Sequence, residues 1–166
     1  MKIIVSNSGK QHSYHVARSL LQLELLDTFY TSSYVSNVAL QNYFLRKGNT
    51  YWTRRFLEGL GGNYVKASWH FEIKEMIYRK MYGKTSKAQN AVYERDENFD
   101  QHVAHQLKNH PKATHFWGFQ GSCLQTLKKA NELGKTTLCE LATAHVTAAK
   151  KILGEVISAD SRQVYK

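Results

Sequence analysis

The last third of the chain most constrains the fold, because strand-like and helix-like segments alternate there with short connections. Residues 113–119 ("ATHFWGF") predict a strand that ends at a glycine turn, and residues 122–133 predict a helix with one apolar side. Gly134 stands where a helix C-cap is expected, and residues 135–142 ("KTTLCELA") predict the next strand. A further helix is predicted over 145–153. This alternation indicates right-handed βαβ units and a parallel sheet with helices on both faces.

The first residues show the same alternation. Residues 2–5 predict a short buried strand, residues 12–26 predict a helix, and residues 27–31 predict a second strand. The expected architecture is therefore a Rossmann-like α/β fold with a helical insertion between about residues 35 and 110.

Apolar spacing divides this insertion into segments. Residues 35–60 are predicted to be helical, and residues 63–68 ("NYVKAS") fit either a strand or an extended link. Two further helices are predicted over 71–81 and 92–107, from apolar residues at helical spacing.

Length and composition fit one folded domain, since the chain has 166 residues of which 42% are hydrophobic. Cys123 and Cys139 are too few for a disulfide framework, and buried thiols in a reducing compartment are expected. No export signal or span of about 20 apolar residues is visible. The expected location is cytoplasmic, with membrane association from the cytosolic side as an option.

The net charge of +10 predicts an anionic partner, although an ordinary lysine-rich surface is the simpler alternative. Residues 44–56 and 70–87 interleave basic and aromatic residues. This pattern suits an anionic membrane interface, and it also suits single-stranded nucleic acid. The candidate membrane or acceptor surface consists of Arg46, Lys47, Trp52, Arg54 and Arg55.

The loop after the first strand, "SNSGKQHS", has one glycine, so it matches neither the dinucleotide fingerprint nor the Walker loop. Gly9 fits a plain turn, or a position where a phosphate approaches the first helix N-terminus. None of the eight histidines has a metal-binding spacing, and no metal is expected.

Both ends of the chain resemble a known family. Residues 1–31 and 114–155 resemble the N-terminal half of family-four retaining glycosyltransferases of the GT-B fold. The shared features are the opening strand, loop and helix, the later strand with its glycine turn, and a strand ending in Glu-x-x-x-x-His, here Glu140 to His145.

The resemblance implies transfer of a sugar from a nucleotide-sugar donor to a glycan or lipid acceptor, without a metal or other cofactor. His145 would be the catalytic residue near the transferred sugar, and Glu140 would support the adjoining loop. The residues implied to face the donor phosphates or line the cleft are Gly9, Lys10, Gln11, His12, Gly118, Gly121 and Glu140.

No segment matches the second Rossmann domain that holds the nucleotide in such enzymes. We therefore expect residues 1–155 to be an acceptor-side domain or fragment that lacks its C-terminal donor domain. Residues 156–166 form a discordant tail that resembles a segment of tRNA dimethylallyltransferases, with Asp160, Ser161 and Gln163 at the matching positions. The tail lacks an upstream phosphate loop, so no prenyl transfer is expected.

Other interpretations stay open. The chain could be a basic nucleic-acid-binding α/β module, although it lacks an RNA-recognition strand or a helix-turn-helix signature, so a nucleic-acid partner is not favoured. It could also be a small α/β enzyme or interaction domain of another family. Judged from the tail alone, a fragment of a tRNA-modifying prenyltransferase is a further alternative.

Overall fold

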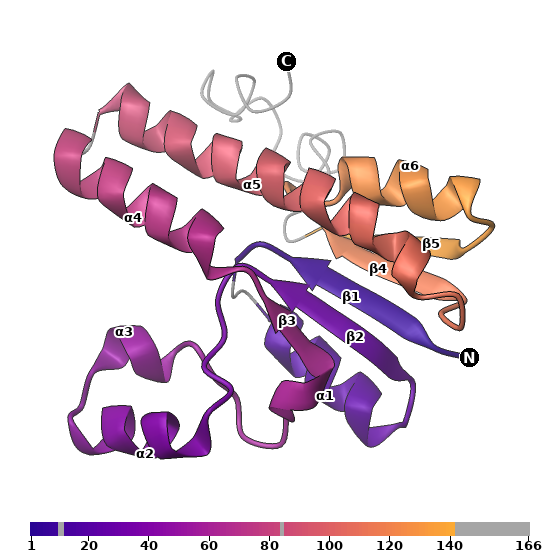
Figure 1. Cartoon of the computed structure of the whole chain (residues 1–166), viewed down its shortest axis with the longest axis horizontal. Helices are drawn as coiled ribbons and strands as arrows, with labels where there is room; N and C mark the ends of the chain where they lie inside the picture. Colours follow the sequence, from indigo (N-terminus) through magenta and orange to yellow (C-terminus); the bar gives the residue numbers. More distant parts are fainter. Residues whose placement is uncertain (10–11, 84, 142–166) are drawn as a thin grey trace, which may run out of the picture.

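A parallel sheet organises the molecule (Figure 1). The structure is a computed structural model that describes residues 1–9, 12–83 and 85–141. Within them, five strands lie in the order β3-β2-β1-β4-β5, and every pair of neighbours is parallel. The strands are β1 (Ile3–Asn7), β2 (Leu26–Thr31), β3 (Val65–Ala67), β4 (His115–Phe119) and β5 (Thr136–Glu140). The expected Rossmann-like α/β class is confirmed.

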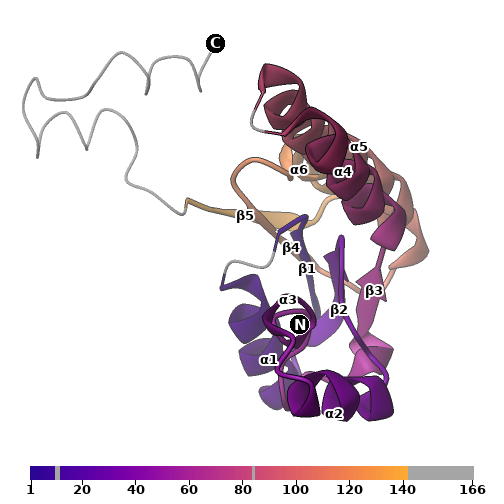
Figure 2. The same cartoon turned by 90° about the vertical axis from the view of Figure 1, so that its left-hand side faces the viewer.

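Helices connect these strands. They are α1 (Ser13–Gln22), α2 (Val38–Arg46), α3 (Thr50–Thr53), α4 (Trp69–Tyr82), α5 (Ser86–Gln106) and α6 (Leu124–Glu132). Single 3-10 turns lie at Gly62–Tyr64 and Leu107–Asn109. In Figure 2 the sheet lies between α1 on one side and α4, α5 and α6 on the other. Helices therefore cover both faces, as predicted.

The central strand β1 shows why the sheet needs a layer of helices on each face. All five of its residues are buried, because successive side chains point to opposite faces and each face packs against helices. Ile3 and Val5 belong to the cluster that contains Tyr14 of α1. Ile4 belongs to the opposite cluster, together with Phe99 of α5.

The first helix ends earlier than predicted. The expected helix over 12–26 is observed as α1, which ends at Gln22. Glu24 adopts the left-handed conformation with φ 57°, and the Leu25 N–H bonds to the Leu20 carbonyl at 2.8 Å. This is the Schellman arrangement, which usually has glycine at this position, so a glutamate there does not indicate a helix end. After α6 the same arrangement uses Gly134, with φ 68°, as predicted.

The insertion also differs from the prediction. The helical stretch expected over 35–60 consists of the short helices α2 and α3, separated at Gly48 with φ 61°. Residues 63–68, which fitted either a strand or a link, contain β3, and Val65 pairs with Phe29 of β2. The insertion therefore contributes an edge strand as well as helices. Residues 145–153 and the tail 156–166 lie outside the described residues.

Candidate functional site

The strand order creates one preferred place for a ligand. From β1 the chain extends the sheet through β2 and β3 in one direction, and later through β4 and β5 in the other. The connections after β1 and β4 therefore leave the carboxyl edge toward opposite faces of the sheet, to α1 and to α6 (Figure 2), and ligands bind at such a point in open parallel sheets. These loops are in contact, since the Ser8 N–H donates to Ser122 Oγ at 3.2 Å. We take this edge as the candidate site.

The loop after β1 is held by its own polar groups. The Gly9 N–H donates to Asn7 Oδ1 at 3.1 Å. Asn7 is buried, and among the described residues its Nδ2 has no hydrogen-bond partner. A buried donor without a partner costs free energy, so a bound acceptor at this position would be favourable. Lys10 and Gln11, which were predicted to face the phosphates, lie outside the described residues.

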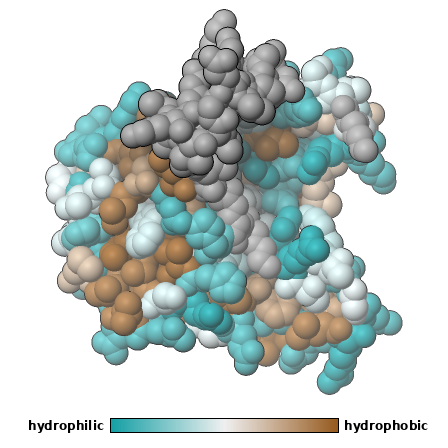
Figure 3. All heavy atoms as spheres, turned by 180° about the vertical axis from the view of Figure 1, so that it is seen from behind, coloured by the Kyte–Doolittle hydropathy of each residue, from teal (hydrophilic) through white to brown (hydrophobic). Residues whose placement is uncertain are grey.

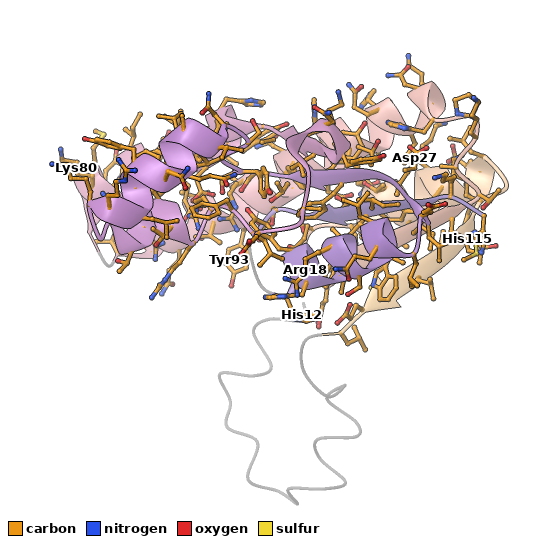
Figure 4. The ribbon with its side chains drawn as sticks, turned by 90° about the horizontal axis from the view of Figure 1, so that it is seen from below. His12, Arg18, Asp27, Lys80, Tyr93 and His115 are labelled. Atoms are coloured by element: carbon orange, nitrogen blue, oxygen red, sulfur yellow. The ribbon has the colours of Figure 1, made fainter. Side chains whose placement is uncertain are left out.

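His12 and Glu140 meet across this edge, although they are far apart in the sequence. The His12 Nε2 contacts Glu140 Oε1, and the Trp117 indole N–H donates to Glu140 Oε2 at 3.1 Å. The His12 ring also packs edge-on against Phe119, with ring centroids 5.3 Å apart. His12 lies at the start of α1 (Figure 4). Glu140 thus connects the start of α1 to the end of β5. Both of its carboxylate oxygens have partners, which suits a residue that supports the adjoining loop.

The two glycines of the second loop differ in surroundings. Gly121 is exposed, with φ 100°, and a side chain added there would meet no atom within 4 Å. Its backbone is therefore accessible beside Ser122. Gly118 is buried in β4, where an added Cβ would lie 2.4 Å from Cys123 Cβ. Gly118 thus allows the start of α6 at Cys123 to pack closely against the sheet.

Sequence reasoning missed the carboxylates that the insertion brings to this edge. Ser8 Oγ donates to Asp96 Oδ1 at 2.6 Å, and Arg95 Nη2 pairs with the same oxygen at 2.6 Å. On the neighbouring loop, Ser32 Oγ donates to Glu72 Oε2 at 2.9 Å. The apolar spacing of residues 71–81 gave the signal for a helix, but it concealed that this helix turns its acidic side inward.

The basic aromatic segment divides into exposed and internal residues. Arg46, Lys47 and Arg54 are exposed, and Trp52 stacks on Phe44 with ring centroids 5.1 Å apart. Arg55 is different, because its guanidinium pairs with the buried carboxylate of Glu72 and lies over a tyrosine ring. Burial alone would lower the pKa of Arg55, but the carboxylate raises it above the ordinary value. Arg55 therefore stabilises the fold and is not a free surface cation.

Two hollows are lined by residues outside the loops after β1 and β4. One of about 620 Å³ opens beside β3 and is lined by Tyr30, Lys66, Trp69 and His102 among others. The other, of about 730 Å³, lies between α5 and α6 and is lined mainly by exposed polar side chains. Neither joins the loops after β1 and β4, so the carboxyl edge stays the candidate site.

The comparisons with known proteins add no relative. No family model, no curated protein and no solved structure matches this chain. Among the described residues, none of the helices combines the length and apolar character needed to cross a bilayer. The same part of the chain contains no group of three or more His, Cys, Asp or Glu side chains arranged to hold a metal ion. His145 lies outside the described residues.

Proposed function

We propose that this chain is the acceptor-side domain, or a fragment, of a retaining GT-B glycosyltransferase. The observation that carries the proposal is the carboxyl edge of the sheet, where the loops after β1 and β4 meet through Ser8 and Ser122. The resemblance of the sequence to that family concerns these same two loops and the strand that ends at Glu140.

In this proposal the edge forms one wall of a cleft. The β1 loop at Gly9 and the start of α1 face the donor diphosphate, because main-chain N–H groups and the helix dipole favour a phosphate there. Gly121 leaves the backbone of the second loop accessible. The nearby carboxylate of Asp96 carries little net repulsion, since Arg95 is paired with it. His145 would complete the site near the transferred sugar.

In this proposal the second wall of the cleft belongs to a separate C-terminal donor domain. That donor domain would hold most of the nucleotide-sugar. The 166-residue chain by itself would therefore provide half of the binding site. Transfer requires both reactants held in one geometry. The isolated chain should therefore show weak diphosphate binding and no measurable glycosyl transfer.

Amide NMR during titration with UDP, GDP and inorganic pyrophosphate tests the phosphate wall. We expect chemical-shift changes confined to Gly9, Gly121 and Ser122. Gly48 and Gly134, which also have positive φ but lie elsewhere, serve as internal controls. Absence of shifts at the loop glycines, or equal shifts at the controls, would contradict the proposed wall.

Transfer itself is tested with a panel of nucleotide sugars and lipid or saccharide acceptors. Clear turnover by the isolated chain above a His145→Ala control would show that the missing domain is not needed. Coding DNA that continues beyond Lys166 into a second Rossmann domain would support the proposal directly, because such enzymes require both halves.

A further inference from the structure

Helix α4 has its polar and apolar sides reversed relative to an ordinary surface helix. Glu72 and Glu75 point inward and are each only 6% exposed. The opposite side carries four large apolar side chains that are 44–67% exposed: Ile73, Met76, Ile77 and Met81. A surface helix normally turns such a stripe toward the core. We call these four residues the α4 apolar face.

The inward carboxylates fix this orientation. Glu72 pairs with Arg55 and accepts from Ser32, and Glu75 pairs with Arg95 and Arg79. Rotating the helix to bury its apolar side would separate these ion pairs, leaving Arg55 without a carboxylate partner and Arg95 with Asp96 alone. Removing one member of a buried ion pair is strongly destabilising. The exposure of the α4 apolar face is therefore enforced by the fold.

The surface around this face is strongly basic. Residues 38–87 contain ten Lys or Arg and three Asp or Glu. Two of those three acids are the buried Glu72 and Glu75, so Glu58 is the exposed one. Lys80 is exposed on α4, and among the described residues it forms no ion pair. Whatever covers the α4 apolar face meets positive charge at its border.

An aromatic cluster adjoins the face on one side. The Tyr51 hydroxyl donates to Met76 Sδ at 2.9 Å, and the rings of Trp52 and Trp69 lie 5.5 Å apart. These residues connect α4 to α2 and α3, which lie below it in Figure 1. No side chain of α2 is buried, and Figure 3 shows a small group of apolar atoms among polar ones at the lower right, over this region. Aromatic rings between apolar and basic residues suit the headgroup level of a bilayer.

We propose that the α4 apolar face, bordered by its basic residues and the adjoining Tyr51–Trp52 cluster, docks on an anionic lipid surface. The aliphatic and methionine side chains enter the acyl boundary, and the cations meet the lipid phosphates. The proposal does not depend on glycosyl transfer, and its test needs no nucleotide sugar.

Charge and side-chain type favour lipid over other occupants. A second copy of the chain would bring the same patch against itself, so Lys80 and its basic neighbours would face like charges. Single-stranded nucleic acid would bind through stacked aromatic rings and cations, and such binding does not bury aliphatic side chains such as Ile73 and Ile77. An anionic bilayer satisfies both the charge and the apolar side chains.

Vesicle flotation tests the proposal with pure phosphatidylcholine and with equal parts phosphatidylcholine and phosphatidylglycerol. Wild-type protein should bind the anionic vesicles and lose binding at high salt. The pair Ile73→Gln and Ile77→Gln should lower the partition coefficient by about tenfold or more, because two inserted side chains are lost. Leu124→Gln, a substitution of an exposed leucine on α6, should leave it unchanged.

The charge contribution has its own matched pair. Lys80→Glu changes the charge by two units and should reduce partitioning about thirtyfold, at roughly 1 kcal/mol for each unit of charge near the surface. Lys128→Glu makes the same change on exposed α6 and should have little effect. Circular dichroism of every variant separates loss of binding from loss of fold.

Tryptophan fluorescence gives a readout that needs no disruptive variant. Brominated lipid should quench Trp52 and Trp69, so the Trp117→Phe protein should retain its quenching, and the Trp52→Phe plus Trp69→Phe protein should lose it.

Equal binding to neutral and anionic vesicles, or unchanged partitioning of the double isoleucine variant, refutes the proposal. A wild-type dimer that becomes a monomer in that variant, without vesicle binding, would assign the face to a second copy instead. Displacement of vesicles by a single-stranded oligonucleotide, with no effect of the isoleucine pair, would assign the surface to nucleic acid.

Discussion

Asp100 should be among the most costly polar residues to remove, because it caps a helix to which it does not belong. It lies on α5 and is buried, yet its carboxylate accepts from the backbone N–H groups of Gln125 and Thr126 at 2.6 and 2.9 Å. It also accepts from Thr126 Oγ1 at 2.5 Å. Cys123, the N-cap residue of α6, makes no side-chain hydrogen bond to the backbone N–H groups that start this helix. Asp100 therefore satisfies the start of α6 and fastens α5 to it.

The magnitude follows from what the Asp100→Ala variant leaves behind. Gln125 is exposed, so water can replace its lost partner, and the Thr126 hydroxyl keeps the backbone carbonyl of residue 100 as an acceptor at 3.0 Å. The N–H of the fully buried Thr126 is left unpaired, so at about 1–3 kcal/mol for a buried unsatisfied donor the expected loss of stability is roughly 1–3 kcal/mol. Asp100→Asn keeps one acceptor oxygen but points an amide at an N–H, so an intermediate loss of about 1–2 kcal/mol is expected.

Urea denaturation followed by circular dichroism measures both losses. Glu97→Ala is the matched control, since Glu97 is an exposed acid on the same helix and should change stability by less than about 0.5 kcal/mol. If Asp100→Ala is as stable as that control, water reaches Thr126 and the account of a buried cap is wrong.

Three further predictions concern packing, backbone and pH. Gly118→Ala should cost about 1–3 kcal/mol of unfolding free energy in urea, because the new Cβ would collide with Cys123; a neutral result would mean that α6 can shift freely. Gly134→Ala should cost about 1 kcal/mol through its positive φ alone, since nothing lies within 4 Å, and an unchanged urea midpoint would contradict this. Burial raises the pKa of Tyr14 to about 12. Stability should therefore fall between pH 10 and 12, as unfolded tyrosine ionises while the folded side chain keeps its proton, by about 3 kcal/mol in total for a shift of this size. Tyr14→Phe should flatten that decline in alkaline denaturation curves, and an unaltered slope would assign it to other groups.

The strands and the fold class were predictable because their signals are local. The runs at β1 and β4 are short, apolar and bounded by turn residues, and they are observed within one or two residues of the predicted limits. Because the strands alternate with helices along the chain, only a few sheet topologies were compatible with the sequence. The end of α1 was not predictable by the same rules, since Glu24 occupies a backbone conformation that usually signals glycine.

Other features depend on partners that are distant in the sequence. The segment Val65–Ala67 is only three residues long, and it is a strand because β2 offers a free edge beside it. The position of the candidate site followed from topology, which placed the loops at Gly9 and Gly121 at one edge. The inward acids of α4 could not be predicted, because their orientation depends on Arg55 and Ser32, which approach only in the folded chain.

The central position of β1 also determines the order in which the sheet can form. Its partner on one side, β2, follows after a single helix, but on the other side Ile3 pairs with His115, which is made much later. Until β4 arrives, a chain growing from the ribosome carries β1 as an open parallel edge, with Ile4 not yet paired with Phe116. Pairings between segments that are distant in the sequence slow folding. Until they form, the unpaired strand edge can pair with other chains. The contact between β1 and β4, which builds the candidate site, is thus also the step at which synthesis of this chain is most exposed to misassembly.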